Sequence, residues 1–430
     1  MLPNRFADEI KSSDAVNFHQ AFAKDFFAEY AGFEPFKLGT HDDILIPETV
    51  RVKLTQSLNL VTDDLVDETT ASLADILGSD PEWHTTMLKD DVLELVARLS
   101  SRVFLGKPLC QDRRWLDIAK NYTVDAFIAS RLMRLAPAII RPIAYWFVPH
   151  TWRIRRQVRN ARTLIDSEVE SRVARAQKAL DAGQKPPKSA DAIGWIYETA
   201  ASHGRQVDLV AAQLSLTLAA IHTTSEALTA ALIHLCEHPE IVQPLRDEAI
   251  EVITTNGWSK AALQKLKLMD SFLKESQRVQ PPSTTSMNRH VSREFELSDG
   301  TVIPANSRFM VAGAYFDPSV FPEPNKFDAF RFANKRLEAG QANLWSHVAT
   351  SPAHMGFGHG QHACPGRFFA SNELRVALVH LLLKYEWHLI EGKMPKNMEF
   401  EANNIVDPKV QVMIRRRKEE VCVDLEEPAA

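Results

Sequence analysis

Cysteine is scarce in this chain of 430 residues, which has only Cys110, Cys236, Cys364 and Cys422. These four lie far apart and form no Cys-x-x-Cys pair, so neither a disulfide framework nor a zinc ribbon is indicated. We interpret them as reduced thiols in a reducing compartment. Cys364 nevertheless stands among glycines and histidines, and this placement needs an explanation.

Long apolar runs are also lacking. The first residues, MLPNRFADEIKSSDA, have neither the basic start nor the apolar core of a signal peptide, and no stretch of about 18 uninterrupted apolar residues follows. We therefore expect no membrane-spanning segment in this chain. An excess of positive charge is missing too, because 50 Lys and Arg stand against 55 Asp and Glu, and this argues against a nucleic-acid partner.

Apolar side chains recur with helical spacing through most of the chain. The pattern predicts helices over 92–104, 115–127, 154–180, 209–235, 261–279 and 368–385. Strand patterns are short and late: a hairpin is expected around Asp299-Gly300, over 295–303, and a strand over 410–416. We expect a mostly α fold in a single domain over 1–430 with a small late β region, a surface loop at 182–189 and a mobile acidic tail at 419–430.

The segment FGHGQHACPG, residues 357–366, is the most informative part of the sequence. Pro365 suits the first turn of a helix, so Cys364 is expected at a helix entrance, where unpaired N–H groups favour the thiolate. Gly358 and Gly360 leave room for a flat group to approach the backbone, and Phe357 offers an aromatic wall. A thiolate there is a nucleophile or a metal ligand.

Two other interpretations of Cys364 compete with this one. His359, His362 and Cys364 could bind zinc, but they supply three ligands at most. A buried, inert cysteine is the commonest case, but it does not explain the glycines and histidines beside it.

The pattern Phe-x-x-Gly-x-His-x-Cys-Pro-Gly resembles the haem-binding signature of cytochrome P450 monooxygenases, and the chain looks similar to fungal members that act on terpenoids or related secondary metabolites. The resemblance implies a haem b whose iron is bound by the Cys364 thiolate, with Phe357, Gly358 and Gly360 beside the haem. Such a ligand favours O–O cleavage. The family usually has arginine in place of His362, so contact of this side chain with a haem propionate is expected to be weaker.

Glu275 and Arg278, in the sequence ESQR, lie three residues apart on a predicted helix that Pro281 ends. Alone, such a pair stabilises a helix by about 0.2–0.5 kcal/mol. It resembles the Glu-x-x-Arg pair of the family, and the resemblance implies Arg331 as a third member. The triad would be structural and would hold the loop that presents Cys364.

A helix of about thirty residues is predicted from Asp208, a suitable N-cap, to His238-Pro239. Its middle, AAIHTTSE, is polar, and hydroxyl groups there can bond back to the preceding turn and loosen it. The segment resembles the distal helix of the family. The resemblance implies room for oxygen at Ala219 and Ala220, stabilisation of a protonated oxygen species by the Thr223 hydroxyl, and proton delivery by His222, Thr224 or ordered water.

Two further segments are less specific. The resemblance implies that residues 283–287 line a substrate cavity and that Arg289 binds a haem propionate, although Arg289 could equally be a surface residue. Residues 135–159 combine Trp146, Phe147 and Trp152 with several arginines, and this could form a peripheral membrane contact or an ordinary pair of core helices.

The implied reaction is insertion of one oxygen atom from O2 into an apolar small molecule, with electrons from NADPH through a separate reductase. The family resemblance suggests the cytosolic face of the endoplasmic reticulum. Such members begin with a membrane anchor and a helix-plus-sheet section, and MLPNRFADEI is expected to follow both. A haem-thiolate isomerase or dehydratase, and a non-catalytic shortened remnant, are the alternatives.

Overall fold

The computed structural model describes residues 1–38, 45–185 and 190–425. The chain divides into two compact units. The first contains Met1–Phe18, Leu58–Val96 and His222–Ala430, and the second contains His19–Ser57 and Ala97–Ile221. The single domain expected over 1–430 stays a prediction.

The first unit is built around α16 (Arg367–Lys384), which is buried over nearly its whole length from Phe369 onward. A helix that is covered on all sides needs apolar residues all round, and the run Val376–Leu383 supplies them. Helices α5, α12 and α13 pack against it. The other helices of this unit are α1 (Ala7–Ile10), α5 (Leu58–Leu77), α12 (Val242–Asn256), α13 (Lys260–Leu263), α14 (Lys267–Val279) and α15 (Arg331–Lys335).

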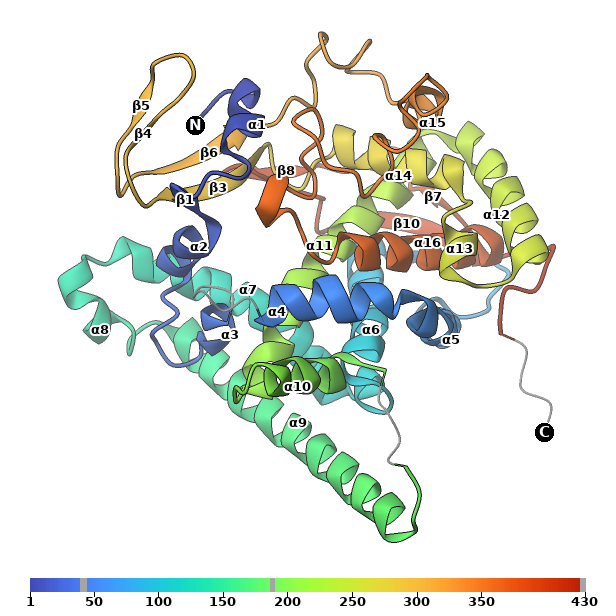
Figure 1. Cartoon of the computed structure of the whole chain (residues 1–430). Helices are drawn as coiled ribbons and strands as arrows, with labels where there is room; N and C mark the ends of the chain where they lie inside the picture. The colour runs from blue at the N-terminus through green and yellow to red at the C-terminus, as the bar shows by residue number, and fades with distance from the viewer. Residues whose placement is uncertain (39–44, 186–189, 426–430) are drawn as a thin grey trace. The chain divides into compact units, whose positions relative to one another are not determined.

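The strands also belong to the first unit and form small antiparallel sheets (Figure 1). The expected strand near the carboxyl end is confirmed as β10, which lies between β2 and β7. The expected hairpin is confirmed as the β4–β5 pair. The strands are β1 (Val16–Asn17), β2 (His84–Met87), β3 (Thr285–Val291), β4 (Phe295–Glu296), β5 (Val302–Ile303), β6 (Arg308–Ala312), β7 (Tyr385–Leu389), β8 (Met398–Phe400), β9 (Asn403–Ile405) and β10 (Gln411–Arg416).

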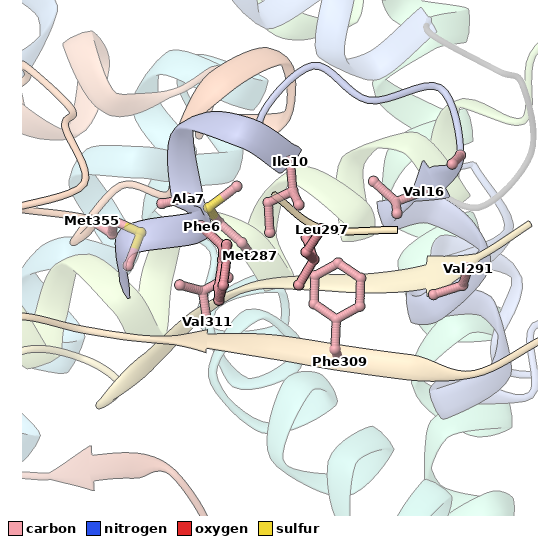
Figure 2. Packing of buried hydrophobic residues seen from close by; sticks show 11 residues of the cluster. Phe6, Ala7, Ile10, Val16, Met287, Val291, Leu297, Phe309, Val311 and Met355 are labelled. Atoms are coloured by element: carbon pink, nitrogen blue, oxygen red, sulfur yellow. The ribbon is translucent and has the colours of Figure 1, made fainter. Parts of the chain in front are cut away.

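The beginning of the chain packs on the sheet of β1, β3 and β6. Figure 2 shows Phe6, Ala7 and Ile10 pointing toward apolar side chains of this sheet. Met355, nine residues before Cys364, belongs to the same buried cluster. Met287, expected to line a substrate cavity, is only 4% exposed and packs in this cluster, and its part in a cavity stays a prediction.

The second unit is helical, and α7 and α9 form its main contact. The carboxylate of Asp125 on α7 accepts a hydrogen bond from Gln157 of α9 at 3.0 Å and lies 2.7 Å from Nδ1 of His150. These buried polar contacts fix the two helices against each other. The helices are α2 (Phe18–Phe26), α3 (Glu34–Lys37), α4 (Leu45–Glu48), α7 (Arg113–Leu135), α8 (Arg141–Ala144), α9 (Pro149–Asp181) and α10 (Ala192–Ser202).

Two long helices contribute to both units, α6 (Leu88–Leu105) and α11 (Leu209–Glu237). Asp208 caps α11 as expected, because its carboxylate accepts the N–H groups of Val210 and Ala211 at 3.0 and 3.2 Å. Among the described residues, α11 alone is long and apolar enough to cross a membrane by length and composition, and its most apolar window is 61% buried in the protein. A core helix has the same composition.

The structure corrects three expectations. The single helix expected over 261–279 is broken into α13 and α14, because the Glu248 carboxylate accepts the N–H groups of Leu268 and Met269 and caps a new helix start. Helices α5 and α12 were not predicted. The tail is ordered as far as residues 423–424, where Trp258 donates to the Val423 carbonyl and Asp424 pairs with Lys384. Residues 186–189 and 426–430, parts of the expected loop and tail, lie outside the described residues.

Candidate functional site

The cysteine loop, which we define as residues 355–366, closes on itself through its backbone. The N–H of Cys364 donates to the Phe357 carbonyl at 2.8 Å, and the N–H of Gly358 donates to the Met355 carbonyl at 2.8 Å. Gly358 and Gly360 have φ values of +72° and +77°. This left-handed region favours glycine, so both positions depend on the absence of a side chain.

The loop leads into α16, whose N-cap is Gly366. Cys364 therefore lies just outside the helix entrance, and Pro365 precedes the first turn. Burial raises the pKa of the Cys364 thiol. The N–H groups of Gly366 and Arg367 and the charge of Arg367 lower it by a smaller amount, so the net shift of the pKa is upward. The N–H groups at the helix start favour the thiolate as expected, but the larger effect of burial opposes them.

The histidines of the loop point to different neighbours. His359 Nε2 lies 3.0 Å from the Asp8 carboxylate. The ring of His362 lies 6.0 Å from that of Phe18, and its Nε2 is 3.2 Å from Nε2 of Gln361. Within the described part of the chain, no group of three His, Cys, Asp or Glu side chains could hold a metal ion, so the zinc interpretation has no support.

The structure brings Glu275, Arg278 and Arg331 together in a buried cluster. Arg278 binds the carboxylate with two hydrogen bonds of 2.8 Å, and Arg331 Nε lies 3.1 Å from both carboxylate oxygens. The arginines also donate to main-chain carbonyls of the segment 315–326. The cluster thus fastens this segment to α14.

Helix α14 also contacts the cysteine loop and the residues just before it. His354 Nε2 lies 3.2 Å from the Lys274 carbonyl. Gly356 packs so closely on Gln277 that a Cβ at this position would lie 2.2 Å from its Oε1. One helix therefore carries both the Glu275 cluster and a surface against which the loop rests.

A second buried polar network near the loop was not predicted. The Asp270 carboxylate accepts from Arg336 and from the N–H of His347 at 3.0 Å each, and it pairs with Arg375 of α16. Lys274, 1% exposed, donates to the carbonyls of residues 346 and 349, and burial lowers its pKa to about 7. Charged residues on a helix normally indicate a solvated face, so the sequence carried no signal for this network.

Arg289, the expected propionate partner, lies on β3 and is 2% exposed. Its Nη1 donates to the Asn288 carbonyl at 2.9 Å, whereas Nε and Nη2 are buried and have no hydrogen-bond partner among the residues that the structure describes. Burial lowers the pKa of the Arg289 guanidinium to about 10. An unmatched buried cation is costly, so this side chain needs an anionic partner.

The polar centre of α11 presents an open face. Ala219 and Thr223, four residues apart, are exposed, whereas Thr224 is buried and His222 is half-buried. Residues four apart share one helix face, so a small side chain and a hydroxyl stand together there. Ala219 and Ala220 belong to the second unit, and His222, Thr223 and Thr224 belong to the first unit with Cys364.

Comparison with known proteins identifies the family. A family model described as "Cytochrome P450" matches residues 49–415. The chain belongs to the cytochrome P450 family. It is an oxidoreductase, a cytochrome P450 monooxygenase, and the haem-thiolate centre is the defining cofactor of this family.

Curated relatives match over nearly the whole chain. The cytochrome P450 monooxygenase bsc11 of Alternaria brassicicola is 41% identical over 430 residues, which are 100% of this chain and 83% of that protein. The cytochrome P450 monooxygenase hepE of Aspergillus oryzae is 41% identical over 418 residues, which are 97% and 76%. These similarities make the chain a P450 of the fungal monooxygenase type.

A solved structure confirms the mostly α fold. The structure titled "Retinoic acid bound cyanobacterial CYP120A1" aligns with a TM-score of 0.69 at 16% identity and covers 97% of this chain and 88% of its own. At this identity the likeness concerns the fold alone. The residues described above fit a haem: the loop supplies a thiol beside two glycines, and the unmatched Arg289 guanidinium suits a propionate.

Proposed function

We propose that this P450 inserts one oxygen atom from O2 into a C–H or C=C bond of an apolar small molecule, a terpenoid or another secondary metabolite. In this proposal Cys364 is the axial ligand of haem b. The observation that supports the haem site is the buried guanidinium of Arg289, because within residues 1–38, 45–185 and 190–425 two of its nitrogens have no acceptor and its charge has no counter-ion. The carboxylates of haem propionates would supply both the hydrogen-bond acceptors and the negative charge.

The protein's own groups would have distinct tasks. When bound, haem supplies the oxygen chemistry. Cys364 would hold the iron, Arg289 and His362 would hold propionates, and the glycines of the loop would let the ring approach the backbone. On α11 the Thr223 hydroxyl would hold a proton near the oxygen site, while His222, Thr224 or ordered water would pass protons on from solvent. The Glu275 cluster would keep the loop in place without taking part in chemistry.

The electrons would come from NADPH through a separate reductase. The reaction supports an external electron donor, because the monooxygenase stoichiometry needs two electrons beyond those that the substrate supplies. Reduction of the haem by NADPH only when reductase is added would support the proposal.

Carbon monoxide difference spectra of the reduced protein test the haem site. We expect the strongly red-shifted Soret band of a thiolate-ligated haem, and its loss in the Cys364→Ser variant. Cys236→Ser is the matched control, because this thiol also belongs to the first unit and burial raises its pKa to about 12. A band at the histidine-ligated position in the unaltered protein, or no haem uptake, would overturn the proposal in favour of a non-catalytic remnant.

The Thr223→Ala variant separates a monooxygenase from a haem-thiolate isomerase or dehydratase. We expect less product for each NADPH consumed, about tenfold less, because proton transfer at the oxygen site loses its hydroxyl. Thr229→Ala is the control, since this threonine lies on the same helix but is buried and bonds back to the Ser225 carbonyl at 2.7 Å. Undiminished product with tightly coupled electron use would contradict the role of Thr223, and product formed without consumption of NADPH or O2 would favour the alternatives.

The segment 135–159 supports a further part of the proposal, a peripheral membrane contact at the cytosolic face of the endoplasmic reticulum. Large apolar side chains gather here with high exposure, 88% for Ile139, 64% for Ile143 and 79% for Phe147. Trp146 and Trp152 are each 51% exposed. We name these five residues the interfacial patch. Exposed apolar groups of this number mark an interaction surface.

The charge around the interfacial patch matches an anionic lipid surface. Between residues 126 and 165 the sequence contains no Asp or Glu, but it contains eight arginines: Arg131, Arg134, Arg141, Arg153, Arg155, Arg156, Arg159 and Arg162. Contacts within the segment also fix the conformation of the interfacial patch. Trp152 Nε1 donates to the Trp146 carbonyl at 2.8 Å, and the Arg155 guanidinium lies 4.6 and 4.8 Å from the two indole rings. Tryptophan beside arginine is typical of membrane-interface segments.

A further inference from the structure

The first residues of the chain contact the cysteine loop directly. We name Asn4–Lys11 the brace; it comprises a single 3-10 turn (Asn4–Phe6), helix α1 and Lys11. Nε2 of His359 lies 3.0 Å from Oδ1 of Asp8, and this oxygen also accepts from Lys11 Nζ at 2.8 Å. The N–H of Gln361 donates to the Lys11 carbonyl at 3.2 Å. The loop is therefore held from outside by one side chain and one main-chain group of the brace.

The brace also holds the segment that leads into the loop. Asn4 Nδ2 donates to the Pro352 carbonyl at 2.6 Å and lies 3.3 Å from the Ala312 carbonyl at the end of β6. Leu2, just before the brace, joins β6 through two main-chain hydrogen bonds, of 2.7 and 3.0 Å. The brace thus connects the β3–β6 sheet to both ends of the segment 352–361.

Apolar packing fixes the brace on its sheet. Phe6, Ala7 and Ile10 are 4%, 0% and 1% exposed, and Figure 2 shows them in one cluster with side chains of β3 and β6. Met355, the first residue of the cysteine loop, lies in the same cluster. Burial of apolar area stabilises this arrangement. The groups of the brace that contact His359 and Gln361 are therefore held in fixed positions.

The close fit at Gly360 shows how tightly the brace packs against the cysteine loop. A Cβ on Gly360 would lie 2.4 Å from the Lys11 carbonyl oxygen and 2.5 Å from the Lys11 Cβ. A Cβ on Gly358 would meet nothing closer than 3.5 Å. Both glycines have positive φ, but only Gly360 has a backbone of another segment against it. Gly360 is four residues before Cys364.

From these contacts we propose that the brace is a positioning element for the axial thiolate: Asp8 and the Lys11 carbonyl hold His359 and Gln361, and this keeps Cys364 at the position needed for iron ligation. The inference rests on the proposed haem site. It assigns no chemistry to Asp8. A loop that is closed only by its own hydrogen bonds would move more freely, and the thiolate would be lost from the iron more often.

The Asp8→Ala variant of the haem-loaded full chain tests the proposal. With the reduced, carbon monoxide-bound protein, we expect the thiolate Soret band to convert to the band of the inactive form about threefold faster, the scale of one partly exposed ion pair. The conservative Asp8→Glu variant should restore much of the lifetime. The Glu9→Ala variant is the matched control, because the neighbouring Glu9 accepts from Ser298 at 2.9 Å and not from the loop.

A conversion rate unchanged by Asp8→Ala, or changed equally by Glu9→Ala, would overturn the role of the brace. Circular dichroism melting of the variants before haem loading separates positioning from general stability. We expect the Asp8 and Glu9 variants to melt alike, and a selective loss of global stability in the Asp8 variant would count against a positioning role.

Hydrogen exchange of the protein without haem gives a second readout. In Gly360→Ala the new methyl group would push the Lys11 carbonyl away, so we expect amides of residues 4–11 and of Gln361 to exchange about tenfold faster. In Gly358→Ala the same backbone strain arises without contact to the brace, and residues 4–11 should keep their exchange rates. Equal exchange of the brace in both variants would contradict the proposal. If the unaltered protein lacks the thiolate band, the proposed function fails, and this exchange experiment still decides whether the brace holds the loop.

Discussion

Arg278 donates two parallel hydrogen bonds of 2.8 Å to the carboxylate of Glu275, and neither side chain reaches solvent. Arg331 binds the same carboxylate and is 8% exposed. Removal of the single anion would leave two buried guanidinium groups without their counter-charge. We expect Glu275→Gln to lower the free energy of unfolding by about 3–5 kcal/mol, measured by urea unfolding with circular dichroism.

The control for this prediction is Glu386→Gln. Glu386 also accepts two hydrogen bonds from one arginine, Arg415, at 2.8 and 2.6 Å, but its side chain is 32% exposed. Its loss should cost less than about 1 kcal/mol because solvent replaces the partner. A similar decrease in the free energy of unfolding in both variants would show that burial does not explain how the Glu275 cluster stabilises the protein.

Arg289→Met should act in opposite directions on the protein with and without haem. Without haem, the variant removes an unmatched buried charge, so we expect unchanged or higher thermal stability. With haem, it removes a propionate partner, so we expect release of haem to an excess of a scavenging apoprotein to be about tenfold faster. Unchanged haem release would contradict the placement of a propionate at Arg289.

Stability should fall in acid because buried histidines stay neutral in the folded protein. Burial lowers the pKa of His380 to about 4 from its ordinary value of 6.5. Between these two values the unfolded chain binds a proton that the folded protein does not. The free energy of unfolding therefore decreases as pH falls from 6.5 to 4, by up to about 3 kcal/mol for this group.

The His380→Phe variant should lose this part of the pH dependence and keep the stacked contact with Trp258, whose ring centroid lies 5.1 Å away. Urea unfolding at pH 7 and pH 4.5 measures the difference. The same substitution at exposed His388 is the control. An identical slope in the His380 variant and the unaltered protein would contradict the prediction.

The double variant Trp146→Ser, Phe147→Ser should bind vesicles of anionic lipid about tenfold more weakly, because each change removes apolar area from the interfacial patch. Co-sedimentation with the vesicles measures the binding, and higher salt should weaken it for all variants since the arginines contribute. Tyr197→Ser is the control, as this residue of α10 is 66% exposed but lies outside the patch. Equal binding by all three proteins would argue against the patch as a membrane contact.

The sequence predicted those elements whose pattern is local. Strand β10 buries Val412 and Ile414, two residues apart, and α11 has both a capping Asp208 and a terminal His238-Pro239, so each is visible in a short window. The sequence pattern did not predict helix α5, because threonine and aspartate interrupt its apolar spacing. In the structure its Thr62 and Thr69 satisfy their hydroxyls by bonding to carbonyls four residues earlier, which makes them compatible with a buried helix.

The candidate site was predictable only where a motif names its residues. The cysteine loop and the Glu275 cluster belong to such motifs, although the position of Arg331 came from family resemblance and not from spacing. The contact between Asp8 and His359 joins residues 351 positions apart, and nothing in either local sequence points to the other. The burial of Lys274 was equally unpredictable from the sequence, because a lone lysine on an amphipathic helix normally faces water.

The packing of the first residues on β3 and β6 also sets an order of events during synthesis. Met355 follows Phe6 by 349 residues. At about 5–20 residues per second, a ribosome completes this last partner on the order of tens of seconds after Phe6 emerges. Until β3, β6 and Met355 have been made, Phe6 and Ile10 lack most of the native surface that covers them and are available to chaperones. Residues near the beginning of this sequence are therefore among the last to reach their final place.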